Sequence, residues 1–170
     1  MSRYPLTFSE FHVGLEFLTP TRRVTEEDIR AFADLTGDHN PLHEDPGFAR
    51  TTRFGTIIAQ GALTFSILTG LWDRAGFMSG TVEAFVGVRS LRFLRPVRAG
   101  DTLRARVRVS ATEPRTRGRG LVTLDNEVLN QRREAVMTCQ AIALLFGERP
   151  PKRSAPSPKG HARAGSQEGR

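Results

Sequence analysis

The sequence has little of what marks secreted and membrane-bound proteins. It contains one cysteine, Cys139, so no internal disulfide can form, and this suits a reducing compartment. No apolar run approaches the roughly 18 residues that a membrane-spanning helix needs. The first residues lack the apolar core of a secretory signal. We therefore expect a cytoplasmic protein without a membrane span, in which Cys139 is a small buried side chain.

The excess of positive charge is concentrated at the C-terminus. The 170 residues carry a formal net charge of +7. Residues 148–170 hold six basic and two acidic side chains, a net +4, which leaves +3 for residues 1–147. Because this tail is rich in proline and lacks periodic apolar residues, we expect it to be disordered. The sequence thus predicts one globular domain over 1–147 and a basic, Pro-rich tail over 148–170, which solvation explains better than nucleic-acid binding.

The first half of the chain has the apolar spacing of helices. Thr25, followed by three acidic residues, is typical of a helix N-cap, and apolar residues recur at helical spacing up to Gly37. Asp45-Pro46 predicts the start of a second, short helix with Phe48 facing inward. Residues 62–75 are apolar around nearly the whole circumference, which predicts a buried helix.

From residue 81 onward the pattern changes to that of strands. Two strands are expected over 81–88 and 88–95. A third, over 102–110, alternates apolar residues with polar ones, and further strands follow over 121–130 and 134–146. Strands that follow helices indicate an α+β domain with an antiparallel sheet. A curved sheet around the long central helix would bury the helix economically.

The stretch from Leu35 to Asp45 concentrates polar chemistry. It places a carboxylate, an amide and two imidazoles within positions 38–43. Gly37 suits the left-handed end of a helix, and Pro41 stiffens the following turn. A rigid loop would hold Asp38 and His43 at a fixed separation, as acid–base catalysis requires. From residue types alone, a catalytic role and that of a polar surface turn are about equally supported.

This stretch lies within a longer motif. Phe32-Ala-Asp-Leu-Thr-Gly-Asp-His-Asn-Pro-Leu-His-Glu-Asp-Pro-Gly-Phe-Ala49 resembles the signature of the MaoC-like hydratase family, the (R)-specific enoyl-CoA hydratases and related acyl dehydratases. A looser resemblance runs from about residue 8 to residue 145 and includes Phe93-Leu-Arg-Pro-Val-Arg-Ala-Gly-Asp101. It implies a hot-dog fold, a long central helix wrapped by a curved antiparallel β-sheet, and a homodimer.

The resemblance also implies roles for residues that match the motif. Asp38 and His43 match the family's catalytic pair, and Asn40 and Ser66 match polar residues that support it. Many members have histidine immediately before the glycine that begins the central helix, where this chain has Gln60. We interpret this departure as a change in the lining of the pocket.

The implied reaction is the addition of water to a 2-enoyl thioester, or its removal from an (R)-3-hydroxyacyl thioester. Asp38 and His43 would share one water and carry out both proton transfers. The backbone N–H groups of Gly61 and Ala62 would stabilise charge on the thioester oxygen. The substrate would be a thioester of coenzyme A or of an acyl carrier protein, and no metal or redox cofactor is needed.

Three alternatives remain open at this point. Hot-dog folds also host thioesterases, and a non-catalytic acyl-CoA-binding protein is a further possibility. A metal site on His39 and His43 is disfavoured because Pro41 lies between them.

Some arginines could bind the nucleotide of coenzyme A, although a solvated sheet face explains them more simply. These arginines are Arg104, Arg106, Arg108, Arg115, Arg117 and Arg119.

Overall fold

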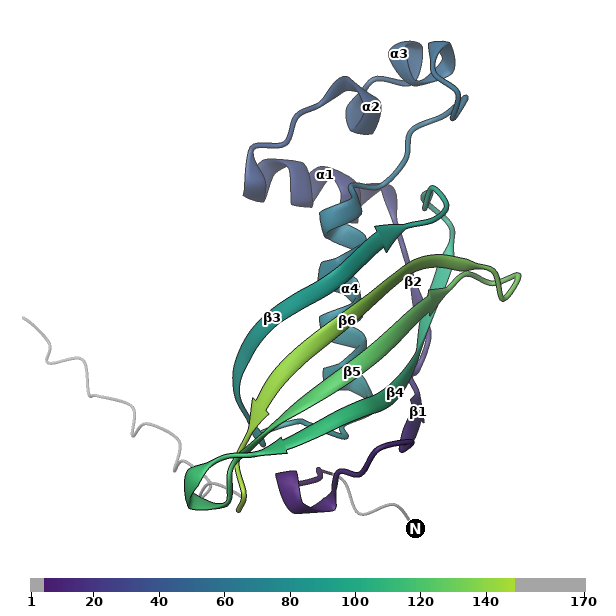
Figure 1. The fold of residues 1–170 in the computed structure, drawn as a ribbon. Helices are drawn as coiled ribbons and strands as arrows, with labels where there is room; N and C mark the ends of the chain where they lie inside the picture. Colours follow the sequence, from purple (N-terminus) through teal and green to yellow (C-terminus); the bar gives the residue numbers. More distant parts are fainter. Residues whose placement is uncertain (1–4, 149–170) are drawn as a thin grey trace, which may run out of the picture.

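The computed structural model describes residues 5–148 and consists of a long helix cradled by a curved antiparallel sheet (Figure 1). The sheet order is β1-β4-β5-β6-β3, and β2 pairs separately with β4. This is the predicted α+β architecture, whereas the predicted disordered tail falls almost wholly outside the described residues.

The strands are β1 (Glu16–Leu18), β2 (Arg22–Arg23), β3 (Val82–Phe93), β4 (Thr102–Pro114), β5 (Gly120–Leu129) and β6 (Ala135–Leu145). The helices are η1 (Phe8–Glu10), α1 (Glu26–Thr36), α2 (Pro41–Glu44), α3 (Pro46–Thr51), α4 (Gly61–Ala75) and η2 (Thr116–Gly118).

The core lies between α4 and the concave face of the sheet. The alternation predicted in β4 is confirmed, because its apolar residues are fully buried and Arg106 and Arg108 between them are exposed. The buried positions are Leu103, Ala105, Val107 and Val109. Cys139 is buried, as expected, and burial raises the pKa of its thiol to about 11. The prediction of two separate strands over 81–88 and 88–95 was wrong. These residues form one strand, β3, whose register against β6 shifts at bulges.

Helix α4 is buried on one side only, which corrects the expectation of a wholly buried helix. Leu68 and Leu71 are fully buried, and the indole N–H of Trp72 donates to Asn126 Oδ1 at 3.0 Å. The opposite side of the helix is open in the single chain. Its exposed residues are Ala62, Ser66, Thr69, Gly70, Asp73 and Arg74.

Helices α1, α2 and α3 lie beyond the N-terminal end of α4 (Figure 1). As predicted, α1 begins at a capping box of Thr25 and Asp28. The turn predicted at Pro41 is instead the start of α2, because proline is favoured at the first position of a helix. Helix α3 starts after Asp45, as predicted, but Phe48 is 45% exposed, so its predicted inward orientation is wrong.

None of the helices within residues 5–148 is long and apolar enough to cross a membrane.

Candidate functional site

The segment between α1 and α3 positions Asp38 and His43. Gly37 adopts a left-handed φ of 76° and ends α1, so that Asp38 follows at its C-terminus. Asn40 caps α2, its Oδ1 accepting from the Leu42 N–H at 3.0 Å. One turn of helix then carries His43 back toward the side on which Asp38 lies. Asn40 Oδ1 is thus occupied in local structure, and the supporting role that the motif implies for Asn40 stays a prediction.

The imidazole of His43 is fixed by a backbone carbonyl. Its Nδ1 lies 2.7 Å from the Ile58 carbonyl oxygen. Because a carbonyl only accepts, Nδ1 must carry the proton and donate, which leaves Nε2 as a proton acceptor in the neutral ring. Only 12% of the His43 side chain is exposed, against 48% of the Asp38 side chain. The histidine is therefore held firmly at the wall of a cavity while the carboxylate meets solvent.

Asp38 and His43 face each other across a short gap. His43 Nε2 lies 4.0 Å from Asp38 Oδ2, which is longer than the roughly 2.7–3.2 Å of a direct hydrogen bond. A single water placed beside both atoms can satisfy both at normal hydrogen-bond distances. The geometry therefore suits the handling of one water by two proton acceptors.

The N-terminus of α4 opens on the same cavity as His43. Gly61, Thr64 and His43 line a hollow of about 220 Å³. Among the described residues, no group accepts from the N–H of Gly61 or Ala62. The first-turn N–H groups of a helix are available to an oxygen and carry its positive dipole end. The cavity thus contains both a proton acceptor and a site for developing negative charge.

The residue before this helix is held inside the protein. Gln60 is 1% exposed, and its Nε2 donates to the Ile29 carbonyl of α1 at 3.2 Å. Its Oε1 is buried and without a partner in the described part of the chain. The Gln60 side chain therefore ties the start of α4 to α1 and points away from the lining of the His43 cavity.

Phe93 covers the first residue of α4. A Cβ added to Gly61 would lie 2.8 Å from carbons of the Phe93 ring. Phe93 lines the cavity that holds His43, and the ring is 52% exposed in the single chain. Glycine at position 61 therefore allows an aromatic ring to pack directly against the helix N-terminus.

The remaining predicted positions lie apart from this cavity. Ser66 Oγ donates to the Ala62 carbonyl at 2.9 Å, on the exposed side of α4, and lines a different hollow. Ala62 does not line the cavity that His43 and Gly61 share. Trp72 and Phe77 lie in the buried core. Within the single chain, the site thus consists of Asp38, His43 and the N-terminus of α4.

Sequence reasoning missed several residues of this cavity. The Ile58 carbonyl is a backbone group and leaves no signal in residue type. Phe93 belongs to the motif quoted above but was interpreted only as part of a strand. Arg53 and Arg95 line the cavity and follow no recognisable spacing.

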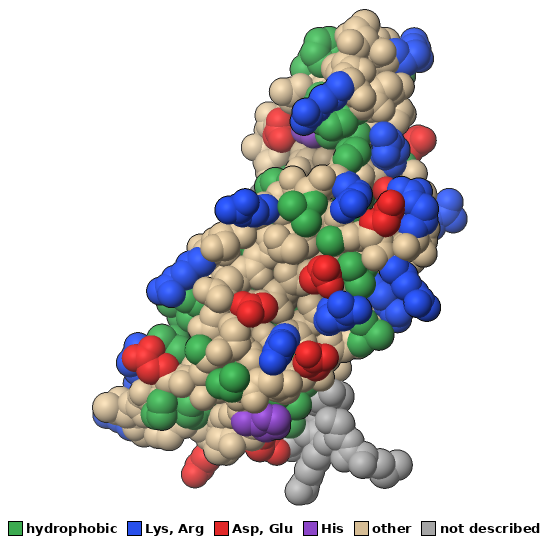
Figure 2. All heavy atoms as spheres, turned by 45° about the vertical axis from the view of Figure 1, so that its right-hand side comes forward, with side chains coloured by type: hydrophobic (Ala, Val, Ile, Leu, Met, Phe, Trp, Pro, Cys, Tyr) green, Lys and Arg blue, Asp and Glu red, His purple; other side chains and the backbone are tan. Residues whose placement is uncertain are grey.

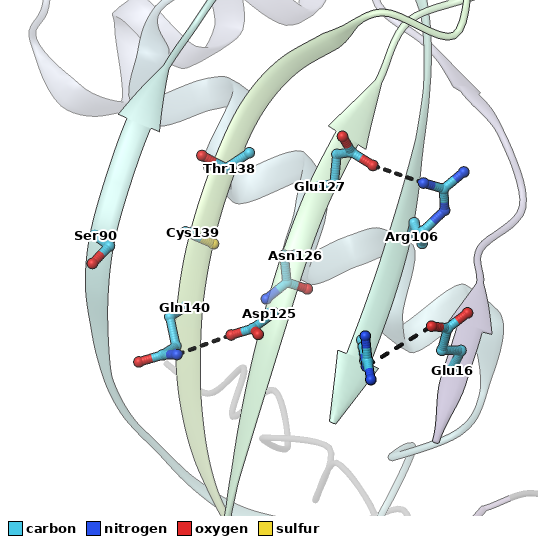
Figure 3. Close-up of a pocket in the computed structure, with 10 residues that line it drawn as sticks. Glu16, Ser90, Arg106, Asp125, Asn126, Glu127, Thr138, Cys139 and Gln140 are labelled. Atoms are coloured by element: carbon cyan, nitrogen blue, oxygen red, sulfur yellow. Dashed lines mark hydrogen bonds and ion pairs between the residues drawn. The ribbon is translucent and has the colours of Figure 1, made fainter. Parts of the chain in front are cut away.

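A further hollow, of about 500 Å³, lies on the outer face of the sheet (Figure 3). Its side chains contact one another: Gln140 donates to Asp125 at 2.9 Å, and Arg106 forms an ion pair with Glu127 at 3.0 Å. Acidic and basic side chains are interspersed over the molecular face in Figure 2. Arg108, which lies 3.9 Å from Glu16, is likewise paired. These pairs favour the simpler interpretation of the arginines in β4 as a solvated sheet face.

His39 does not join the cavity. Its Nδ1 lies 3.1 Å from Glu44 Oε2 at an exposed position. Within residues 5–148, no three histidine, cysteine or acidic side chains cluster in a way that could hold a metal ion.

The model of the MaoC-like domain matches residues 10–131 of this chain. The (R)-specific enoyl-CoA hydratase of Aeromonas caviae is 34% identical over 125 residues, which cover 74% of this chain and 89% of that protein. Protein MaoC of Klebsiella aerogenes is 40% identical over 100 residues, 59% of this chain but only 29% of its own length. The solved MaoC-like dehydratase of Rhodospirillum rubrum superimposes with a TM-score of 0.76 at 31% identity, covering 84% of this chain and 98% of that one.

The solved structures that this chain resembles have the hot-dog fold, and this chain shares it, as the motif led us to expect. The family match extends over most of the chain and includes both the Asp38–His43 segment and the start of α4. The protein therefore belongs to the family of MaoC-like domains.

Proposed function

We propose that the protein is a lyase that adds water to a 2-enoyl thioester, or removes it from an (R)-3-hydroxyacyl thioester. The observation that carries this proposal is the position of His43. With its proton fixed on Nδ1, its Nε2 lies 4.0 Å from Asp38 Oδ2, and the residue lines one cavity with Gly61 at the free N-terminus of α4. Relatives that bear hydratase and dehydratase names support it. The lone, buried cysteine supports a reducing, cytoplasmic setting.

In the proposed hydration, one water lies between Asp38 and His43. His43 Nε2 removes a proton from this water while the Asp38 carboxylate accepts the second hydrogen bond and orients it. The water oxygen forms its bond to the β carbon, and the electron pair of the double bond moves toward the thioester oxygen. The imidazolium then returns the proton to the α carbon on the same face. Atoms and charge balance within the protein, and no metal or redox cofactor enters the step.

The N-terminus of α4 stabilises the intermediate. Negative charge that develops on the thioester oxygen is met by the N–H of Gly61, with Ala62 beside it, and by the helix dipole. Loss of one such donor typically costs roughly 10²–10³ in rate. The acid–base pair and the helix N-terminus therefore contribute at opposite ends of the same conjugated system.

The first test is turnover of crotonyl-CoA, followed by loss of the enoyl absorbance. Asp38→Asn and His43→Gln should each lower kcat by about 10²–10⁴, because the first removes the carboxylate that orients the water and the second removes the group that transfers the proton. His39→Gln is the matched control, since His39 lies in the same segment but at an exposed position paired with Glu44; it should retain activity within a few-fold.

Three outcomes would contradict the proposal. Full activity in either variant of the pair would remove its assigned role. Release of free thiol without loss of the enoyl group would indicate a thioesterase, and binding without turnover across thioesters of graded chain length would indicate a non-catalytic acyl-CoA-binding protein.

We also propose that the protein forms a homodimer through β3. This strand pairs with β6 on one edge only, and apolar side chains along it are exposed in the single chain. An open, apolar edge strand is a template for pairing with a second strand. The exposed residues are Val82, Phe85, Val86, Leu91 and Phe93, with Leu94 directly after them.

A further inference from the structure

Two arginines line the cavity that holds His43 and Gly61, and neither has an acidic partner there. They are Arg53, in the turn after α3, and Arg95, which follows β3. No aspartate or glutamate is among the residues that line this cavity. Both arginine side chains are exposed. Among the described residues, the lining of this cavity therefore carries an excess of positive charge.

The contacts of these arginines orient them without neutralising them. The Arg53 guanidinium lies 4.8 Å from the centre of the Phe54 ring, and Arg95 Nη1 donates to the Ala135 carbonyl at 2.6 Å. An aromatic ring and a carbonyl carry no net charge. Glu134 interacts electrostatically with Arg95, but its carboxylate accepts its hydrogen bonds from Asn130 and Arg132. The Arg53 and Arg95 guanidinium groups thus retain donors for an external anion.

The neighbouring hollow around His43 differs in its charge. Arg30 and Arg98 line it together with Glu26 and Glu44, so acidic and basic side chains balance. Arg98 Nη2 also donates to the Phe54 carbonyl at 3.3 Å, which fixes the turn that carries Arg53. The outer sheet face is balanced as well, through the pairs of Arg106 and Arg108. Of these three hollows, only the cavity of His43 and Gly61 has arginines but no acidic residue in its lining.

We propose that Arg53 and Arg95 bind phosphate at the end of the pantetheine arm that delivers the acyl thioester. This inference rests on the proposed function, because it takes the thioester to lie between His43 and Gly61. The arm must then leave through the mouth of this cavity, where the two arginines lie. Guanidinium groups bind phosphate with paired, charge-assisted hydrogen bonds. The same phosphate chemistry is offered by coenzyme A and by the prosthetic arm of a carrier protein.

Binding of unacylated ligands tests the inference without turnover. Calorimetry is carried out on the full chain with coenzyme A, 4′-phosphopantetheine and pantetheine. Arg53→Ala and Arg95→Ala should each weaken binding of the phosphorylated ligands by about tenfold, the loss of one hydrogen-bonded charge pair. Pantetheine, which has no phosphate, should bind equally to all variants. Arg106→Ala, an exposed arginine on the outer face, is the matched control and should bind all three ligands like the unmodified chain.

The ligand series also separates the two sources of phosphate. An equal loss for coenzyme A and 4′-phosphopantetheine assigns the arginines to the phosphate that carrier proteins share. A loss for coenzyme A alone assigns them to the phosphates of its nucleotide. An equal loss for pantetheine, or no loss for any ligand, would overturn the inference.

Turnover gives a second, independent measurement. With crotonyl-CoA, the arginine variants should raise KM about tenfold and leave kcat unchanged, because phosphate binding is uniform along the reaction. With crotonyl-pantetheine, they should match the unmodified chain. A protein inactive on both thioesters that still bound coenzyme A through Arg53 and Arg95 would refute the proposed reaction and support the inference. A fall in kcat on both thioesters would contradict it.

Discussion

Gly61 shows how the absence of a single side chain shapes the candidate site. The position begins α4 and needs no unusual backbone conformation, so conformational freedom does not explain the glycine. The Phe93 ring explains it, because a Cβ would approach the ring to 2.8 Å. Since Phe93 is half-exposed, the ring can move outward, and the cost of a methyl group should be modest.

We expect Gly61→Ala to lower the free energy of unfolding by about 1 kcal/mol, at the low end of overpacking effects. In a Phe93→Ala background the same substitution should cost much less, because the clash is gone; chemical denaturation of the four proteins measures this coupling. Gly70→Ala, on the same helix with open space around its Cβ position, is the control and should be neutral or stabilising. An equal cost of Gly61→Ala in both backgrounds would show that Phe93 does not impose the glycine.

At the scale of elements, α1 sets the position of Asp38. Its N-terminus is fixed by Thr25 and Asp28, and Arg22 Nη2 donates to Asp28 Oδ1 at 2.7 Å. Partial burial alone would raise the pKa of Asp28, but the hydrogen bond from the Thr25 N–H and the Arg22 guanidinium outweigh it and lower this pKa. The charged carboxylate is thus favoured in the folded state.

Asp28→Asn should therefore destabilise the protein by about 1 kcal/mol at neutral pH, the usual size of a capping effect. Because the folded pKa is lowered, this stabilisation is present above the unfolded pKa of about 4 and is lost as pH falls through the folded value. Thermal unfolding between pH 7 and pH 3 measures it, with Asp34→Asn on the same helix as control. A stability difference that stayed constant with pH would contradict this account.

The elements that could be predicted are those with local signals. The cap at Thr25, the end of α1 at Gly37 and the alternation in β4 depend on neighbouring residues alone. Helix α2 was interpreted as a turn because Pro41 signals both a turn and a helix start, and four residues give no periodicity. The Ile58 carbonyl that holds His43 lies 15 positions away, and only the tertiary fold brings them together.

For the whole molecule, the open edge of β3 is the feature that bears on assembly. The strand is 12 residues long, and its second edge has no partner strand within residues 5–148. One side of α4 is likewise exposed, because no other described element of the chain covers it. Local patterns predicted β3 as two strands. They predicted α4 as one helix but overestimated its burial, because one chain does not supply all the surface that an apolar helix needs.

A charge on this edge should break the proposed homodimer. The unmodified chain should have a mass in solution of about twice 18.9 kDa, and Val86→Glu should shift it toward the monomer because a charge at an apolar interface is costly to bury. Sedimentation measures the mass. Leu35→Glu is the control, since Leu35 is 82% exposed on α1. A monomeric unmodified chain, or a Val86→Glu dimer of unchanged affinity, would refute assembly through β3.

The hydrogen bond between His43 and Ile58 has a consequence for the precision of the site. Ile58 lies three residues before Gly61, so one short, largely buried piece of backbone both fixes the imidazole and begins the α4 N-terminus. If α4 shifts against the sheet, the proton acceptor and the oxyanion donor travel together, and their spacing is preserved. Within residues 5–148, no comparable hydrogen bond holds the Asp38 carboxylate, and about half of its side chain is exposed. A shift of α4 should therefore change mainly the position of the Asp38 carboxylate relative to His43 and the N-terminus of α4.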